Sequence, residues 1–255
     1  MTKVLNHLFL SFTIIFSTPY IFAAEPNKAE DPILDSLNYP ELQVTPSASH
    51  RLLTEFKDER SNRWGVHWAI QTSALATLLT ATSLAEKKDT KWSVDEAKQK
   101  KDDYDNATTL GTLVGGGWIV ATILLSANYE PYKDGVVEFK KHKGEDKRAR
   151  LTRERVSDSQ IRAAARLGRK LRWMSVVSNF IAAGYMAVNT TDEGAAVAGL
   201  AGLLAFTPMM FPNRWEQVHE DHEYYKKKIY GPITRSKLFG TPQGLVPGLS
   251  VSFNF

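Results

Sequence analysis

Residues Asn106–Tyr129 read NATTLGTLVGGGWIVATILLSANY, a run of 24 residues without a charged side chain. Its length is close to the roughly 20 residues that a helix needs to cross the hydrocarbon layer of a membrane. Three further uncharged runs of similar length occur at 64–85, 173–191 and 194–213. The pattern predicts a mainly α-helical membrane protein with about four hydrophobic helices.

The charged residues are gathered between these runs. The chain of 255 residues has 32 Lys and Arg, 28 Asp and Glu, a mean hydropathy of −0.29 and no cysteine. That mean is typical of a soluble protein, but it averages apolar runs with strongly charged connectors. Because cysteine is absent, disulfides, thiolate metal sites and cysteine nucleophiles are excluded.

Residues 1–24 have the pattern of a secretory signal peptide. Lys3 precedes an uncharged stretch that ends at Phe22, and two alanines follow. A basic start, an apolar stretch and small residues in this order predict export from the cytoplasm. The alternative is an uncleaved membrane anchor, because bulky Phe22 would occupy a position near the cleavage site where a small residue is preferred.

Two segments separate the predicted signal peptide from the first uncharged run. Residues 25–48 contain four prolines and little periodicity, so we expect an extended leader. In residues 49–63, Leu52, Leu53 and Phe56 recur among charged residues. That spacing predicts an amphipathic helix lying at the membrane surface.

The uncharged runs are expected to pair into two helical hairpins, at 64–129 and 173–213. Residues 86–105 connect the first two runs and contain a capping-box pattern starting at Ser93, which predicts one short polar helix. Only Asp192 and Glu193 separate the third and fourth runs, so these two helices must be antiparallel neighbours.

Tryptophan follows arginine at three edges of the runs: Arg63-Trp64, Arg172-Trp173 and Arg214-Trp215. Tryptophan is enriched where lipid headgroups meet the hydrocarbon layer, so these residues are predicted to be interfacial anchors. The repeated dipeptide also raises the hypothesis of an internal duplication.

Between the hairpins, residues 130–172 form a basic connector with fourteen basic and seven acidic side chains, a net charge of +7. In its later part, Arg162, Arg166 and Arg169 alternate with apolar residues at helical spacing. This predicts a basic amphipathic helix that leads directly into the third run. Such a helix could lie on an anionic membrane surface or against the acidic leader of the same chain.

The charge distribution conflicts with the usual orientation in an inner membrane. A signal peptide places residue 25 outside the cytoplasm, and four crossings then leave the basic connector outside as well, although basic loops are normally cytoplasmic. Either the run 64–85 does not cross, which leaves three spans in the inner membrane, or the hairpins lie in the outer membrane. The C-terminal segment favours the outer membrane.

That segment, residues 214–255, is predicted to contain a polar helix and then a short β-strand. Leu249, Val251, Phe253 and Phe255 alternate with polar residues, the period of a half-exposed strand. A terminal Phe on such a strand resembles the closing segment of outer-membrane β-barrel proteins, although the chain lacks the further alternating segments that a barrel requires. These four residues are candidates for a docking or sorting strand.

Small residues four apart within the runs predict close helix packing. The candidates are Gly111 and Gly115 in one run and Gly194, Ala198 and Gly202 in another. This spacing lets helix backbones approach each other, and it serves either packing within one bundle or assembly into a homo-oligomer.

Polar residues inside the runs are candidates for a path through the membrane: His67, Gln71 and Asn179. The alternative is that these groups form hydrogen bonds between helices. No run contains a charged side chain, which argues against an ion-coupled transporter.

Two histidines, His219 and His222, are weak candidates for a metal site, with a solvated charged helix as the alternative. Their spacing is not that of HExxH, and the sequence contains no phosphate-binding loop and no nucleophile elbow. No catalytic residue and no cofactor are therefore predicted. The basic connector lacks interleaved aromatic residues, so nucleic acid is not an expected partner.

The segment Asn38-Tyr-Pro-Glu-Leu-Gln-Val-Thr-Pro-Ser-Ala-Ser-His-Arg51 resembles part of exported helical membrane proteins of Bdellovibrio-like predatory bacteria. The resemblance implies a place in the bacterial envelope and no particular activity. We therefore expect a non-catalytic envelope protein with a structural or self-assembling role. Its expected partners are the lipid bilayer and further copies of the chain or another envelope protein. A channel or transporter subunit and a metal-binding membrane protein are the alternatives.

Overall fold

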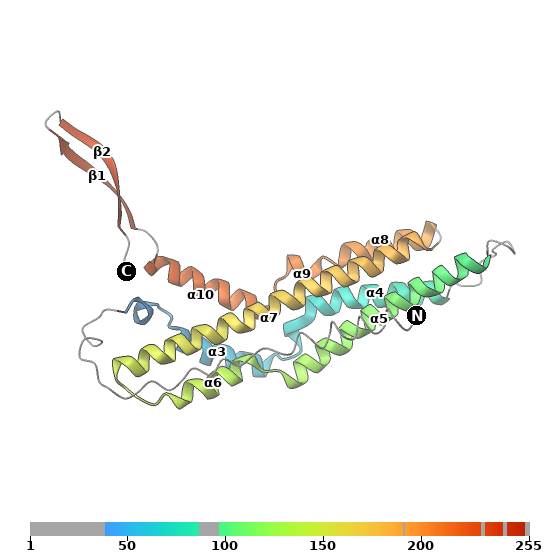
Figure 1. Ribbon diagram of the computed structural model, residues 1–255, viewed down its shortest axis with the longest axis horizontal. Helices are drawn as coiled ribbons and strands as arrows, with labels where there is room; N and C mark the ends of the chain where they lie inside the picture. The colour runs from blue at the N-terminus through green and yellow to red at the C-terminus, as the bar shows by residue number, and fades with distance from the viewer. Residues whose placement is uncertain (1–38, 87–96, 191, 231–232, 242–243, 253–255) are drawn as a thin grey trace. The chain divides into compact units, whose positions relative to one another are not determined.

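The computed structural model describes residues 39–86, 97–190, 192–230, 233–241 and 244–252, and within them the chain is mainly helical, as the sequence predicts. Helix α7 (Lys147–Val188) is a single helix of 42 residues to which the other helices attach (Figure 1). The Asp146 carboxylate caps its start by accepting a hydrogen bond from the backbone N–H of Ala149. The basic connector therefore leads directly into the third uncharged run, as predicted.

Three helices contact the N-terminal half of α7 and form a part that we call the base, residues 39–63, 130–172 and 214–230. They are α3 (Ala48–Ser61), α6 (Pro131–Lys141) and α10 (Arg214–Tyr230), with the short 3-10 helix η2 (Pro40–Gln43) beside them. Their core consists of large apolar side chains, among them Leu52, Tyr132, Ile161, Trp215 and Val218. The base is thus built like a water-soluble protein, with a large apolar core.

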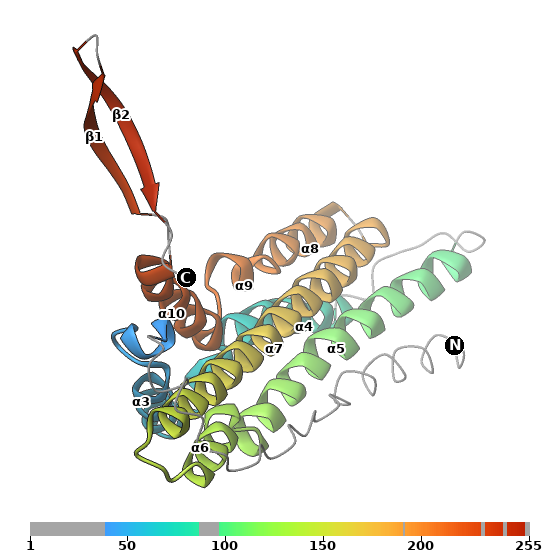
Figure 2. The same ribbon diagram turned by 60° about the vertical axis from the view of Figure 1, so that its left-hand side comes forward.

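The remaining helices pack along the C-terminal half of α7 and form the hairpin part, residues 64–129 and 173–213 (Figure 2). They are α4 (Trp68–Glu86), preceded by the 3-10 helix η3 (Gly65–His67), then α5 (Ala97–Asn128), α8 (Asp192–Leu204) and α9 (Thr207–Met210). Helix α4 contacts α5, α7 and α8, and α5 also contacts α7.

Among the described residues, two stretches of helix are long and apolar enough to cross a membrane, Lys101–Lys141 and Asp192–Tyr230. Length and apolarity alone do not separate a membrane span from the core helix of a soluble protein. The degree of burial is informative here, because only 33% and 39% of their most apolar windows lie inside the protein. Most of these windows face outward.

The predicted short polar helix between the first two runs is not a separate element. Residues 97–105 form the first turns of α5, which continues without a break to Asn128. No glycine or proline interrupts the segment before Gly111, so nothing stops the helix there. The predicted cap, Ser93, lies outside the described residues.

The fourth run is a kinked helix. Proline has no backbone N–H, so Pro208 cannot donate a hydrogen bond to the carbonyl of Leu204, four residues earlier. Helix α8 ends at Leu204, whose carbonyl instead accepts a hydrogen bond from the Thr207 hydroxyl at 2.7 Å. The prediction of one uninterrupted helix over 194–213 missed this proline.

Two predicted membrane-surface positions lie inside the base. Helix α3 buries Leu52 completely against neighbouring helices, so this part of its apolar face is covered by protein. Trp215 is only 2% exposed, whereas Trp64 and Trp173 are 60% and 53% exposed. The prediction of an interfacial anchor is therefore wrong for Trp215, whose indole is needed in the core of the base.

At the C-terminal end, β1 (Ile233–Thr241) and β2 (Gly244–Ser252) pair as an antiparallel hairpin, with Ile233 opposite Ser252. Leu249 and Val251 occupy β2 opposite Ser236 and Thr234. The sequence pattern predicts no strand at 233–241, so it gives no partner for β2 within the chain. Phe253 and Phe255 lie outside the described residues, and a docking or sorting role for this segment stays a prediction.

Candidate functional site

The helices of the hairpin part approach each other closely at glycine. A Cβ atom added to Gly115 of α5 would lie 2.6 Å from the backbone oxygen of Ala74 on α4. A Cβ added to Gly111 would lie 2.6 Å from the Sδ atom of Met186 on α7. Real side chains do not approach this closely, so larger residues at these positions would push α5 away from its neighbours.

The second set of predicted packing residues lies on α8. A Cβ on Gly194 would lie 2.8 Å from the Leu84 side chain, and Ala198 is fully buried. Gly202 differs, because its added Cβ would lie at an ordinary 3.7 Å from Ala183. The glycine at 202 is therefore not required by packing within one copy of the chain.

Large apolar side chains gather on the outside of the hairpin part. They occur on α4, α5, α8, α9 and the later half of α7, and include Leu75, Leu79, Leu113, Val120, Leu124, Val177, Phe180, Ile181, Val188, Leu200, Leu203 and Met210. The interior of the same part is lined by small or hydroxyl side chains, such as Ala81, Ala107, Ala183, Ser73 and Thr77. Large apolar residues such as Ile70, Trp118 and Met186 are buried there too, so the hairpin part differs from the base mainly in the apolar surface that it exposes.

Several polar groups inside the hairpin part form hydrogen bonds, although the Oδ1 atom of Asn179 accepts none. The Asn179 amide donates a hydrogen bond to the backbone oxygen of Ser175 at 2.8 Å, and the Ser175 hydroxyl lies 3.3 Å from that of Ser73 on α4. His67 has a different partner, the Asn213 amide, 3.2 Å from its Nδ1. Gln71 is half-buried one turn after His67. Asn179 is thus bound within α7, Ser73 and Ser175 join α4 to α7, and His67 contacts the segment that precedes α10. A path for a solute stays a prediction.

The hairpin part and the base meet in a layer of ion pairs that we call the junction. Each arginine of the three Arg-Trp dipeptides pairs with a glutamate there. The pairs are Arg63 with Glu130, Arg172 with Glu216 at 2.9 Å, and Arg214 with Glu55 at 2.8 and 3.0 Å. Each pair joins two elements that are distant in sequence, so the junction fixes the points at which the chain enters and leaves the hairpins.

Glu216 of the junction and Glu59 of α3, which forms none of these three pairs, are deeply buried. Glu216 is 0% exposed and has a second cation nearby, since the Arg169 guanidinium lies 3.8 Å away. Glu59 accepts a hydrogen bond from the Trp215 indole at 3.1 Å and one from the Tyr132 backbone N–H at 3.4 Å. Burial disfavours its charged form and raises the pKa of Glu59 to about 7, although these hydrogen bonds oppose the shift.

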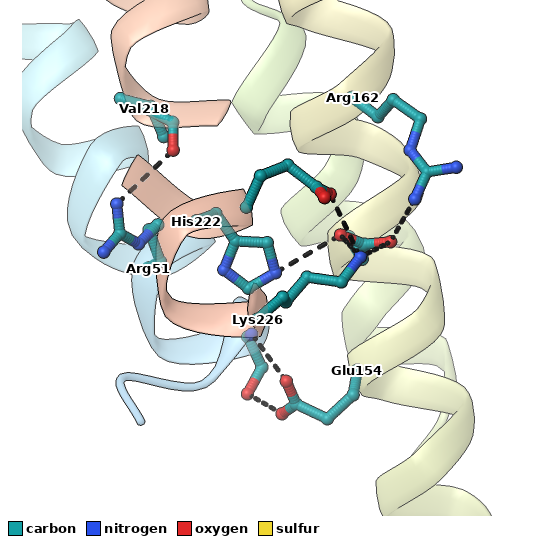
Figure 3. A network of polar contacts seen from close by, with 9 residues as sticks. Arg51, Glu154, Arg162, Val218, His222 and Lys226 are labelled. Atoms are coloured by element: carbon teal, nitrogen blue, oxygen red, sulfur yellow. Dashed lines mark hydrogen bonds and ion pairs between the residues drawn. The ribbon is translucent and has the colours of Figure 1, made fainter. Parts of the chain in front are cut away.

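A cleft of about 460 Å³ in the base lies between the start of α3, the early part of α7 and α10. Asp158 lines this cleft and lies 3.2 Å from His222 Nε2, 2.9 Å from Arg162 and 3.3 Å from Lys226, three partners that are labelled in Figure 3. Burial alone would raise the pKa of Asp158, but the hydrogen bond from His222 and the charge of Lys226 outweigh it and lower that pKa to about 2.

The other acidic groups of the cleft also have partners. Glu154 accepts a hydrogen bond from the backbone N–H of Ser49, and Glu41 pairs with Arg155 at 3.0 Å. Glu223 pairs with Lys226 at 3.1 Å. The charges neutralise one another and tie η2, α3 and α10 to α7. This arrangement stabilises the base and leaves these carboxylates little freedom to act as acids or bases.

The two candidate metal ligands lie on α10, but they do not form a cluster. His222 directs its Nε2 to Asp158, and burial lowers the pKa of His219. Within the part of the chain that the structure describes, no group of three or more His, Asp or Glu residues has the geometry to hold a metal ion.

Comparison with protein families, with curated proteins and with solved structures finds no match to this chain. The function must therefore be argued from the geometry. The junction glutamates were missed by the sequence analysis. Glu55 and Glu59 fall three and seven residues after Leu52, on the same face of α3, and carboxylates on an apolar face are the signal that could have revealed buried ion pairs.

Proposed function

We propose that this chain is a non-catalytic integral membrane protein of a bacterial envelope, with two helical hairpins in the bilayer and a charged base at the membrane surface. Its role is structural: the hairpins anchor the base, and the base offers a folded surface for assembly with further copies or with another envelope protein. The membrane anchor is argued from the hairpin part, and the surface for assembly is argued from the base.

The exposed apolar surface of the hairpin part carries the proposal. Monomeric soluble proteins seldom expose contiguous apolar patches larger than roughly 300–600 Å². Here large apolar side chains are exposed on α4, α5, α8 and the later half of α7 together, so the apolar surface surrounds this part on several sides. Hydrocarbon is the solvent in which such a surface has no cost.

The interior of the hairpin part supports the same conclusion. Helices in a bilayer gain nothing by hiding large apolar residues from lipid, so they associate through small residues and hydrogen bonds. Gly111, Gly115 and Ala198 pack between helices, and Ser73 and Ser175 lie within hydrogen-bond distance of each other between α4 and α7. A soluble helical bundle would normally place leucine and isoleucine at such positions.

The proposal assigns both hairpin entrances to one side of the membrane. The base contains residues that precede, separate and follow the hairpins, so two full crossings by each hairpin return the chain to the base each time. With an exported N-terminus the base lies outside the cytoplasm, which agrees with the outer membrane, where the positive-inside rule does not apply. A cytoplasmic base in the inner membrane is the competing arrangement.

Single-cysteine labelling tests the proposal directly, because the chain contains no cysteine. Leu203→Cys and Tyr224→Cys place a thiol at exposed positions, one in the hairpin part and one in the base. In membranes, a water-soluble maleimide should label the Tyr224→Cys protein and not the Leu203→Cys protein, and detergent should make both reactive. Equal labelling before detergent, or release of the chain by alkaline washing, would disprove membrane insertion.

Two further measurements refine the placement and the role. Density-gradient fractionation of cell membranes should recover the chain with the outer membrane, and recovery with the inner membrane would favour the cytoplasmic base. Light scattering in mild detergent tests self-assembly. A monomer would count against a scaffold of identical subunits. The partner that binds the base would then be another envelope protein.

A further inference from the structure

One exposed face of α7 changes from cationic to apolar within a single turn. Arg162, Arg166 and Arg169 are exposed at spacings of three and four residues, so they lie on one face of the helix. Trp173, Val177 and Phe180 continue this face and are also exposed. Because α7 is one unbroken helix, the change of character at Trp173 marks a boundary between two solvents.

The end of α3 and the residues that follow it show the same change from a cationic to an apolar surface. At the end of α3, exposed Arg60 precedes Trp64 and Trp68, and both tryptophans are exposed. The Trp68 ring lies 5.0 Å from the ring of Phe211, and these two residues line one small crevice together with Arg172. These aromatic residues thus lie at one level: Trp64 and Trp68 after α3, Trp173 after Arg172, and Phe211 before α10. Such an arrangement is typical of an aromatic belt.

The cations beside this belt fall into two groups. Arg63, Arg172 and Arg214 are engaged in the ion pairs of the junction. Among the described residues, exposed Arg60, Arg166 and Lys170 have no carboxylate within ion-pair distance, and Arg169 is half exposed with Glu216 at the limit of that distance, 3.8 Å. The second group is free to bind an anion from outside the chain.

We propose that Arg60, Arg166, Arg169 and Lys170 form a collar that binds the phosphate groups of acidic phospholipids. The inference rests on the proposed membrane insertion and adds a partner to it. The tryptophans fix the depth of the chain at the headgroup level, and the long cationic side chains then reach the phosphates that lie just outside the hydrocarbon. Arginine and lysine suit this task because both donate hydrogen bonds to phosphate oxygens.

Charge complementarity favours acidic lipid over neutral lipid at this surface. A basic residue close to an anionic bilayer contributes about a five-fold gain in binding. Neutral phosphatidylcholine also has a phosphate, but its choline group cancels the charge. The collar therefore predicts selectivity for the net charge of the lipid headgroup and weak binding of free phosphate, which is not held at the depth of the belt.

The test uses the full chain in mild detergent, titrated with phosphatidylglycerol, phosphatidylcholine or inorganic phosphate, with thermal unfolding as the readout. Phosphatidylglycerol should raise the melting temperature of the wild-type chain, and the other two should not. In the triple variant Arg166→Gln, Arg169→Gln, Lys170→Gln, the amount of phosphatidylglycerol that gives half of the stabilisation should rise by about a hundred-fold, from about five-fold for each cation.

The matched control is Lys140→Gln, Lys143→Gln, Arg150→Gln, which removes the same charge from exposed positions of the base. Arg150 precedes Trp173 by 23 residues on α7, about 35 Å at the rise of an α-helix, well beyond the screening length of about 10 Å. This control should respond to phosphatidylglycerol like the wild type.

Three results would overturn the collar: an unchanged response in the collar variant, an equal loss in the control variant, or equal stabilisation by phosphatidylcholine or phosphate. Alkaline washing of membranes that contain the wild-type chain keeps the two proposals apart. A chain that resists washing but shows no lipid selectivity contradicts the collar alone, whereas a chain released by washing contradicts membrane insertion and the collar together.

Discussion

The base and the hairpin part share α7, yet they differ in the surface that they expose. In the base, Leu52, Ile161 and Trp215 are buried and the charged residues surround them. In the hairpin part, alanine, serine and glycine occupy many interior positions beside larger residues, and large apolar residues such as Leu203 and Val188 are exposed. The same helix serves both arrangements, because its exposed face changes character at Trp173 while its backbone continues unchanged.

In the proposed membrane protein, each half is arranged for the solvent around it. Water rewards the burial of large apolar groups, at about 25 cal/mol for each Å² removed from it, and this gain is absent in hydrocarbon. Packing density and hydrogen bonds then decide which residues suit the interior of a bundle. The junction lies between the two halves, and there ion pairs between arginine and glutamate join the elements.

The largest expected effect is at the junction itself. Arg172→Met removes the nearest cation from Glu216, which is 0% exposed, and an uncompensated buried charge costs about 3–5 kcal/mol of the free energy of unfolding. Arg162→Met breaks an ion pair on the surface of the base and should cost about 0–1 kcal/mol. Unfolding of both variants in mild detergent measures the difference.

A double variant sharpens this result. In Arg172→Met with Glu216→Leu, both charges of the pair are gone, and most of the lost stability should return, because apolar side chains often replace buried ion pairs without loss. Equal losses for Arg172→Met and Arg162→Met would contradict the view that the junction holds the two halves together.

The next prediction compares a substitution in the hairpin part with one in the base, because the two parts are proposed to face different solvents. Leu203 and Tyr224 are 71% and 60% exposed, so in water a change to aspartate would alter stability by about 0.5 kcal/mol or less at either position. If the hairpin part is surrounded by lipid, Leu203→Asp should cost about 3 kcal/mol of insertion free energy and Tyr224→Asp almost nothing. The measurement is the fraction of expressed chain that remains in membranes after alkaline washing. Equal fractions for both variants would remove the distinction between the halves.

A smaller effect probes the packing rule of the hairpin part. Gly115→Ala forces a methyl group against the backbone of α4 and should destabilise the chain by about 1–3 kcal/mol. Gly116→Ala adds the same methyl group where no atom lies within 4 Å, and should stabilise it by up to about 1 kcal/mol through helix propensity. Thermal unfolding compares the two. Loss of stability in both would point to a contact between copies of the chain at Gly116.

The sequence was sufficient to predict the helical class and the continuity of the basic connector with the third run. Of the predicted packing glycines, Gly111, Gly115 and Gly194 lie close against neighbouring helices, whereas Gly202 does not. These features depend on local periodicity and spacing, which a sequence displays directly. It was insufficient for the burial of Trp215, the pairing of β1 with β2, and the ion pairs of Glu55 and Glu216. These depend on which distant segments meet. Three Arg-Trp dipeptides look alike in the sequence, and only packing makes one tryptophan a core residue.

The last prediction concerns pH and separates the base from the hairpin part by titration. Burial raises the pKa of Glu59 from 4.5 to about 7. Between these values the unfolded chain releases the proton of this carboxyl while the folded chain keeps it, so stability falls as pH rises from about 4.5 to about 7. Glu59→Gln has no proton to lose, and its free energy of unfolding should be flatter over this range.

The matched control is Asp158→Asn. The pKa of Asp158 is lowered from 3.8 to about 2, so the stability that this carboxylate contributes is present above pH 3.8 and is lost only as pH falls toward 2. The variant should therefore keep the wild-type slope between pH 4.5 and 7. If the slope instead persists in Glu59→Gln and vanishes in Glu216→Gln, the titrating group lies on α10 rather than on α3, because burial also raises the pKa of Glu216. A slope that either Glu59→Gln or Glu216→Gln removes belongs to the base, because both carboxyls lie there.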